Sequence, residues 1–165
     1  MTWIATPWIG RRRIVLGAAS AAAAIAVPRR LLRAQETRLA TPRQTEGPFY
    51  PVSWAGDADN DLVVVQGEAA KALGQVAHVE GRVLDLAGQP IKDATVEIWQ
   101  CDAKGVYRHP RDERGSRSVD KGFQGRGRAL TDASVRYTFR TIKPVAYPGR
   151  TPHIHVKVKL GRQEL

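Results

Sequence analysis

An all-β sandwich is the fold class that this sequence predicts for most of its 165 residues. No segment after residue 35 repeats apolar residues every 3.6 positions, as a surface helix would. Short stretches instead alternate apolar and polar residues, and glycine and proline separate them. The expected organisation is a signal segment at residues 1–34, an extended arm or loop at 35–75 and a β-sandwich domain at 76–165.

Five expected strands follow from this pattern. The first runs from Val76 to Leu86, and a turn at residues 87–90 leads to a second from Ala94 to Cys101. A long polar excursion begins at residue 102, and loops of this length are commonly functional. A strand–turn–strand unit occupies residues 128–144, and residues 151–160 form the last expected strand.

Most of the net charge of +10 belongs to the N-terminal segment, which holds six arginines and no acidic residue. The remainder has 20 basic against 16 acidic residues, without the basic and aromatic stripe of a nucleic-acid surface, so no nucleic-acid partner is expected. The run from Ile14 to Val27 is uncharged and too short to span a bilayer, but it suits an export signal. Arg12 and Arg13 before it resemble a twin-arginine signal.

Two readings of the N-terminal segment stay open. If it is an export signal, the protein is periplasmic or extracellular, with no stable membrane span after cleavage at Ala34. The alternative is a basic tail or an uncleaved anchor. Cys101 stands alone in the sequence and cannot form an internal disulfide, so we expect a small buried residue there.

Two of the four histidines, His153 and His155, occupy alternate positions of the last expected strand. Residues i and i+2 of a strand point to the same face about 6.6 Å apart, so both imidazoles can meet one metal ion. Lys157 and Lys159 are expected to continue this face toward solvent. The opposite face is aliphatic and is expected to face the core; it consists of Ile154, Val156, Val158 and Leu160. The alternative is a pair of exposed histidines on an edge strand.

Two tyrosines add candidate donors. Tyr147 precedes the last strand within a segment that prolines at 144, 148 and 152 stiffen, and Tyr107 lies at the base of the long excursion. Two phenolates with two imidazoles suit ferric iron better than zinc or copper(I). Either tyrosine could instead be an ordinary core or turn aromatic. Trp99 is expected to pack in the core or beside the ligands, His78 to be structural, and His109 to be an exposed loop residue.

The sequence resembles the intradiol ring-cleavage dioxygenases, the protocatechuate and catechol dioxygenase family. The similarity lies in "TEGPFYP", "GRVLDLAGQPIKDATVEIWQCDAKGVYRHP", "FQGRGRALTDASVRYTFRTIKPVAYPGR" and "RTPHIH", which occur in family order. The resemblance implies a β-sandwich and a non-haem Fe(III) site with Tyr107, Tyr147, His153 and His155 as ligands. It also implies that Arg150 balances the charge of a bound catecholate and that Tyr147 accepts a substrate proton.

The implied reaction cleaves the ring of a catechol-type substrate with O₂ between its two hydroxyl-bearing carbons. We expect "TEGPFYP" to line the mouth of the site or to contact a partner subunit, with Tyr50 touching substrate. The family carries tryptophan where this chain has Gly149, which leaves the preferred catechol open. The chain also ends ten residues after His155, and we expect an unpaired sheet edge beside the metal.

Three functions stay open at this stage. The leading one is an exported ferric intradiol dioxygenase, as a monomer or as a homo-oligomer whose partner subunit completes the pocket. A secreted β-sandwich binding module with surface histidines is the second. The third is a dioxygenase-like protein that binds metal or aromatic ligands without turnover.

Overall fold

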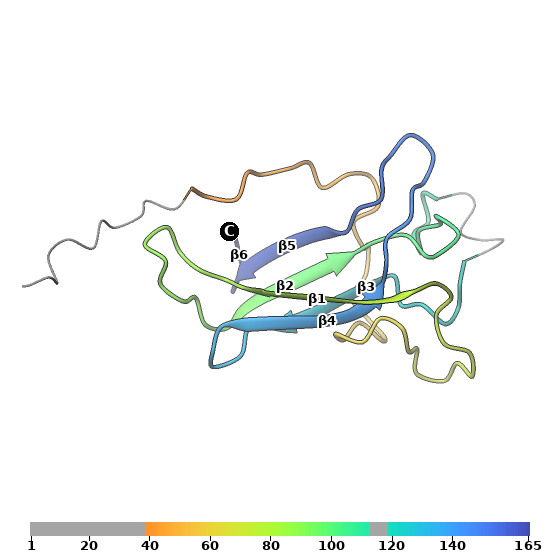
Figure 1. Ribbon diagram of the computed structural model, residues 1–165, viewed down its shortest axis with the longest axis horizontal. Coiled ribbons are helices and arrows are strands. Elements are labelled where there is room, and N and C mark those ends of the chain that lie inside the picture. The colour runs from red at the N-terminus through yellow and green to blue at the C-terminus, as the bar shows by residue number, and fades with distance from the viewer. Residues whose placement is uncertain (1–38, 113–118) are drawn as a thin grey trace, which may run out of the picture. The chain divides into compact units, whose positions relative to one another are not determined.

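The computed structural model describes residues 39–112 and 119–165, and the predicted export signal lies outside them. The described residues form six strands and no helix, so nothing in them crosses a membrane as a helix. The strands are β1 (Val76–Arg82), β2 (Ala94–Trp99), β3 (Arg126–Leu130), β4 (Arg136–Ile142), β5 (His155–Leu160) and β6 (Gln163–Glu164). They make a two-stranded sheet, β1-β4, and a four-stranded sheet in the order β3-β2-β5-β6, with all pairs antiparallel (Figure 1). The predicted all-β sandwich is confirmed.

The core lies between the two sheets and follows from the alternation of β2 and β4. Ala94, Val96 and Ile98 of β2 are fully buried, and they cluster with Phe139 of β4. Ile142 of β4 and four buried residues outside the strands complete this cluster; the four are Leu62, Val63, Val83 and Phe123. Burying an aliphatic or aromatic side chain stabilises the fold by about 1.5–3 kcal/mol each, so this row is the main source of stability.

The β2 side chains that alternate with the core residues lie on the outer face of the four-stranded sheet. Trp99 lies opposite His155 of β5 on one side and opposite Arg126 of β3 on the other. Two residues back along β2, Glu97 lies opposite Lys157. Directly opposite residues of antiparallel strands put their side chains on one face, about 5 Å apart. This face therefore presents aromatic and charged groups rather than a second aliphatic layer.

Residues 39–54, which we call the arm, cross this outer face from β6 to β3. In chain order, Arg43 pairs with Glu164 of β6 at 2.8 Å, and Glu46 pairs with Lys157 of β5. The arm then reaches β2 and β3, where the Tyr50 hydroxyl donates to Glu97 Oε2 at 2.8 Å and the carbonyl of Trp54 accepts from Arg128 at 3.3 Å. Figure 1 shows this segment in orange beside β5.

Two expectations about β5 are wrong. The strand begins at His155, so His153 lies in the segment before it; β2, the partner of β5, ends at the Trp99–His155 pair. Lys157 and Lys159 do not continue toward solvent, because the arm covers them and leaves their side chains 14% and 27% exposed. Sequence alternation shows which residues share a face but not what covers it.

The expectation that four aliphatic residues of the last strand face the core is correct for only two of them. Ile154 and Val158 pack against the core, whereas Val156 and Leu160 are 48% and 40% exposed. A two-stranded sheet is too narrow to cover all four strands of its partner. The short strand β6, which the sequence pattern missed, pairs with β5 at Lys159 and Leu160. Beyond β6, the same edge of β5 has no paired strand at residues 155–157 among the described residues. An unpaired sheet edge beside the site was expected.

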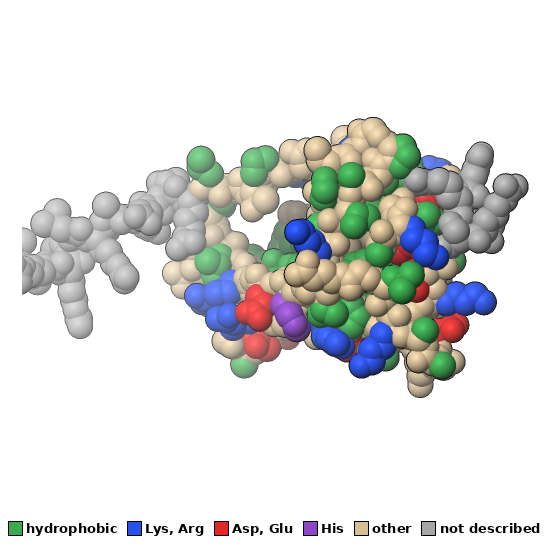
Figure 2. Space-filling view, turned by 45° about the vertical axis from the view of Figure 1, so that its right-hand side comes forward, with side chains coloured by type: hydrophobic (Ala, Val, Ile, Leu, Met, Phe, Trp, Pro, Cys, Tyr) green, Lys and Arg blue, Asp and Glu red, His purple; other side chains and the backbone are tan. Residues whose placement is uncertain are grey.

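Basic and acidic side chains are interspersed on the face of the molecule in Figure 2, with apolar groups between them.

The first strand is shorter than expected and ends at Arg82; Leu84 then bridges to Pro90 across the turn. Cys101 is buried, as expected of an isolated cysteine.

Candidate metal centre

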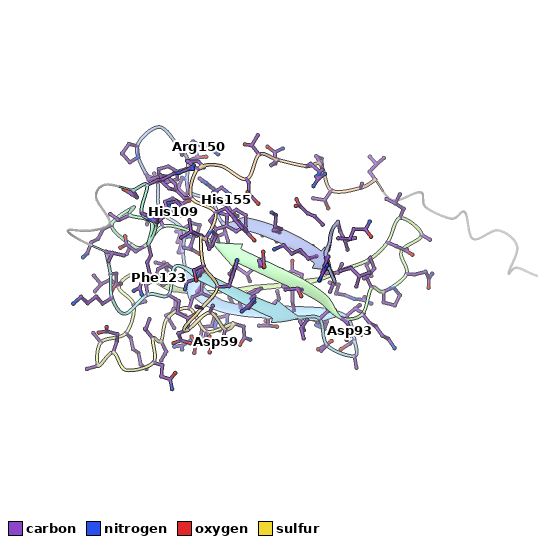
Figure 3. The ribbon with its side chains drawn as sticks, turned by 180° about the vertical axis from the view of Figure 1, so that it is seen from behind. Asp59, Asp93, His109, Phe123, Arg150 and His155 are labelled. Atoms are coloured by element: carbon purple, nitrogen blue, oxygen red, sulfur yellow. The ribbon has the colours of Figure 1, made fainter. Side chains whose placement is uncertain are left out.

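Four aromatic rings from three separate segments gather at one end of the sandwich. The Tyr107 and Tyr147 ring centroids are 5.3 Å apart, and Tyr107 is 6.3 Å from His155. His153 completes the group at 5.5 Å from Tyr147 and 4.7 Å from His155. Figure 3 shows His155 and Arg150 at this end, with Asp93 at the opposite end. The structure thus brings together all four of the predicted ligand side chains.

Tyr107 is held by a loop whose backbone bonds to two buried carboxylates. Asp102 Oδ1 accepts from the Lys104 and Val106 amides at 2.9 and 3.0 Å, which closes the turn after β2. The Tyr107 amide donates to Asp112 Oδ2 at 2.9 Å. Gly105 sits at φ 75, and a Cβ there would lie 3.0 Å from the Ala146 carbonyl. The glycine lets this loop approach the Tyr147 segment closely.

The Tyr107 hydroxyl is buried and has no hydrogen-bond partner among the described residues. Burial raises the pKa of this phenol, Tyr147 raises it further by its charge and by a hydroxyl contact too loose to satisfy hydrogen-bond geometry, Cys101 adds to this, and Arg150 opposes them. A buried hydroxyl without a partner is costly, so such groups in native proteins usually have a ligand or a functional role. The arm residue Phe49 stacks on the Tyr107 ring at 4.5 Å and shields it.

Tyr147 and Arg150 are the first and last residues of one tight turn. The Arg150 amide donates to the Tyr147 carbonyl at 2.9 Å, with Pro148 and Gly149 between them. Gly149 has φ 78, the left-handed conformation that the third position of a type II turn requires. Glycine adopts this conformation without strain, so it suits this position of the turn. Tyr147 is half-buried and Arg150 is exposed, so both can meet a ligand from solvent.

The two histidines present their Nε2 atoms to each other at 3.1 Å. His153 Nδ1 bonds to the Thr151 carbonyl at 2.6 Å. A carbonyl only accepts, so Nδ1 carries the proton, and Nε2 of the neutral ring offers a lone pair. Burial first, then His153 and Arg150, lowers the pKa of His155 to about 4. Both rings are therefore suited to bind a metal, since metals bind the neutral imidazole.

Trp99 and His109 are the other aromatic residues expected near this site. Trp99 stacks on His155 with ring centroids 4.7 Å apart and ring planes 8° apart. This agrees with the expectation that Trp99 packs beside the candidate ligands. The expectation of an exposed His109 is wrong: it is buried, and its ring lies 5.7 Å from Phe49. Its Nδ1 accepts from the Arg111 amide, which stabilises a turn that the sequence pattern did not reveal.

Tyr50 lies one aromatic layer away from the four rings. Its ring contacts Trp99 edge-on at 5.1 Å, and its hydroxyl bonds to Glu97 and to Lys159. A contact of Tyr50 with substrate stays a prediction. Phe49, its neighbour in the chain, makes the direct contact with the tyrosine pair.

The donor set fits a hard trivalent cation. No group of three or more His, Cys, Asp or Glu side chains in residues 39–112 and 119–165 could hold a metal, so a site there needs the phenols. Two phenols and two imidazoles converge, the Tyr107 hydroxyl lacks a partner among the described residues, and His153 turns an Nε2 lone pair toward the Nε2 atom of His155. Phenolate oxygen is an anionic ligand for iron, and Fe³⁺ would deprotonate both phenols.

Three residues that support the site were missed at the level of sequence. Asp102 and Asp112 carry a weak signal, since Asp followed by Gly three residues later is typical of a turn. Phe49 lies in the "TEGPFYP" stretch that was expected to line the mouth of the site, but its contact with Tyr107 was not foreseen, because its stacking partner is far along the chain. Contacts of that kind depend on the tertiary path of the arm.

Fold and site together define a class of protein: a β-sandwich with phenol and imidazole side chains gathered at one end. The family model described as "Dioxygenase" matches residues 45–163. The chain belongs to the intradiol ring-cleavage dioxygenase family.

Known proteins that this chain is similar to bear dioxygenase names. The protocatechuate 3,4-dioxygenase beta chain of Burkholderia cepacia is 41% identical over 120 residues, which cover 68% of this chain and 51% of the relative. The dioxygenase domain of a dioxygenase carbohydrate-binding protein fusion from Streptomyces sp. SirexAA-E has a TM-score of 0.57 at 34% identity, covering 76% of this chain and 70% of that one. An intradiol ring-cleavage dioxygenase from Tetranychus urticae has a TM-score of 0.54 at 31% identity, covering 70% and 56%. The chain thus spans about half the length of the Burkholderia relative.

Proposed function

We propose that this protein is a ferric, non-haem intradiol dioxygenase that cleaves the ring of a catechol-type substrate with O₂. The observation that carries the proposal is the convergence of Tyr107, Tyr147, His153 and His155, with the buried Tyr107 hydroxyl left without a partner in the described structure. Family membership supports the reaction type, and the donor set supports iron.

In this proposal the two tyrosines differ in role because they differ in exposure. Tyr107 is 2% exposed and fixed by its loop, so it is the permanent ligand. Tyr147 is half-buried at a turn, so it can leave the metal and accept a proton from a catechol hydroxyl. Bound Fe³⁺ would supply Lewis acidity, which withdraws electron density from the substrate ring and activates it toward O₂.

Arg150 is the proposed electrostatic partner of the substrate. Its positive charge acts on the site, since it lowers the pKa of both Tyr107 and His155. A cation placed there stabilises the negative charge of a catecholate and the charge that develops during ring opening. Tyr50, one layer back, is proposed to contact the ring substituent of the substrate.

Gly149 leaves room at the mouth of the site. A Cβ at this position would meet nothing within 4 Å in the described structure. We therefore expect substituted catechols to enter as readily as catechol itself.

The experiment that tests the proposal is iron loading followed by spectroscopy and oxygen uptake. Tyrosinate bound to Fe³⁺ should give a visible charge-transfer band, and the loaded protein should consume O₂ with a panel of catechols. Tyr107→Phe should weaken iron retention and change the band, whereas Tyr137→Phe, on β4, is the matched control and should change neither.

Each negative result points to one of the alternatives. A colourless protein with bound iron would contradict the tyrosinate ligands and favour a binding module. A coloured protein without oxygen uptake would instead identify a metal-binding relative that lacks turnover.

We also propose that the protein is exported, on the basis of the arginine pair and uncharged run in residues 11–27. Expression in a bacterium with an active twin-arginine route should place the mature protein outside the cytoplasm. Replacing both Arg12 and Arg13 by lysine should retain it inside. Equal export of both forms would contradict the proposal.

A further inference from the structure

A buried carboxylate on β2 bonds to the arm. Glu97 is 3% exposed, and its Oε2 accepts from the Tyr50 hydroxyl at 2.8 Å. The Lys159 ammonium lies 2.8 Å from Oε2 and 3.0 Å from Oε1 of the same carboxylate, and it donates to the Tyr50 hydroxyl at 2.9 Å. The three groups form a closed ring of charge-assisted hydrogen bonds, which are stronger than neutral ones.

A second lysine extends this attachment along the arm. The Lys157 ammonium lies over the Tyr50 ring, 4.4 Å from its centroid, and pairs with Glu46. It also lies 3.3 Å from Glu164, which Arg43 holds from the other side. Each of these outer pairs is partly exposed and individually weak. The strongest restraint on the arm is therefore the buried ring around Glu97.

The arm residue beside Tyr50 is the one that contacts the tyrosine pair. Phe49 stacks on Tyr107 with ring centroids 4.5 Å apart and lies edge-on to Tyr147 at 6.2 Å. Prolines 48 and 51 flank the Phe49–Tyr50 pair. Proline restricts its own φ and the conformation of the preceding residue. Pro51 thus restricts Tyr50, and because Phe49 is bonded directly to Tyr50, restraining Tyr50 also limits where the Phe49 ring can lie.

We propose that Glu97 is a positioning residue: it anchors Tyr50, and through this neighbour in the chain it holds the Phe49 ring against Tyr107. Its effect at iron rests on the proposed function, whereas its effect on the arm does not. In the described structure Glu97 has no hydrogen bond or ion pair with the four ring donors, so it acts on them through its neighbours: the arm, and Trp99, which contacts Tyr50 and stacks on His155.

The test measures Phe49 directly by fluorine NMR of the full chain, labelled with fluorophenylalanine and free of metal. The chain has three phenylalanines, and Phe123 and Phe139 are 1% and 0% exposed in the core, so they serve as internal references. Glu97→Gln keeps the size of the side chain but removes the charge. The matched control is Glu80→Gln, the same change at a half-exposed carboxylate on β1 that pairs with Arg136 at 3.6 Å.

We expect Glu97→Gln to move the Phe49 signal toward that of solvent-exposed fluorophenylalanine while both core signals stay in place. Loss of hydrogen bonds to a charged group should raise the detached population of the arm about tenfold or more. Glu80→Gln should leave all three signals unchanged. An unchanged Phe49 signal in a folded Glu97→Gln variant would overturn the proposal.

If Glu97→Gln does not fold, Tyr50→Phe provides the test, because it removes the hydroxyl and keeps the Glu97–Lys159 pair and the ring contacts. The same Phe49 shift is expected, and its absence would overturn the proposal.

Iron-loaded protein gives the second readout. Glu97→Gln should release iron faster and shift the visible band, and Glu80→Gln should do neither. Unchanged release and band would overturn the coupling of Glu97 to the metal site. If the wild type binds no iron, the proposed function fails, while the fluorine result still decides whether Glu97 holds the arm.

Discussion

Tyr107→Phe should stabilise the metal-free protein while it impairs the loaded one. The Tyr107 hydroxyl is buried and lacks a hydrogen-bond partner among the described residues, so the folded state bears its desolvation cost. Mutational data put that cost at about 1–3 kcal/mol. Phenylalanine keeps the ring that stacks on Phe49 and removes the costly atom. We expect the free energy of unfolding of the metal-free variant to rise by about 1–2 kcal/mol.

Urea denaturation followed by tryptophan fluorescence measures this change. For a slope of about 2 kcal/mol/M, the midpoint should rise by roughly 0.5–1 M. Tyr137→Phe removes a hydroxyl outside the site and is the control. With iron added the order should reverse, because binding to the native state stabilises the wild type more than the variant.

The reasoning would be refuted if metal-free Tyr107→Phe were less stable than the wild type. That result would mean that the hydroxyl makes a favourable interaction without metal. Equal stabilisation of both proteins by iron would refute the ligand role instead.

Three further results are expected. Lys159→Met should destabilise the fold by about 3 kcal/mol, because it removes the cation that pairs with the buried Glu97. Adding Glu97→Leu should recover most of this loss. Urea unfolding of the single and double variants measures both effects, and purely additive costs would contradict the expectation. The pKa of His155 is lowered to about 4, so between about pH 4 and 6.5 the unfolded state binds more protons than the folded state. The stability of the metal-free protein should therefore fall as the pH drops through this range and level off below it. His155→Gln should remove this pH dependence, whereas His78→Gln should retain it. Gly149→Ala should destabilise the folded protein by about 1–2 kcal/mol, because alanine is strained at φ 78. It should also weaken iron retention, which chelator competition measures. Iron retention equal to that of the wild type would contradict the importance of the turn.

The sequence predicted those parts of the fold and site that local pattern encodes. Alternation located β2, β4 and β5, and the stiff segment around Tyr147 marked the turn that presents it. Phenol and imidazole chemistry selected the four rings that the structure gathers, although their role as ligands stays a prediction. The boundaries of β1 and β5 were less accurate, because strand ends depend on the length of the pairing partner.

Features that depend on the path of the arm could not be predicted. Lys157 and Lys159 are solvated in any reading of β5 alone, and only the crossing arm covers them. Phe49 and Glu97 give no local signal either, since Tyr50 and its acceptor are 47 residues apart in the chain. Helix and strand patterns report neighbours within a few residues, whereas these contacts are set by tertiary structure.

The route of the arm also sets an order of events during folding. Arg43 and Glu164 are 121 residues apart, so the first contact of the crossing requires one of the last strands to be in place. Closing so large a loop is slow compared with forming local pairs, and contacts of this range form late in most folding reactions. The four rings are therefore enclosed only after the sheets have assembled, and under the proposed function the uptake of iron should lag behind the appearance of β-structure in a refolding experiment.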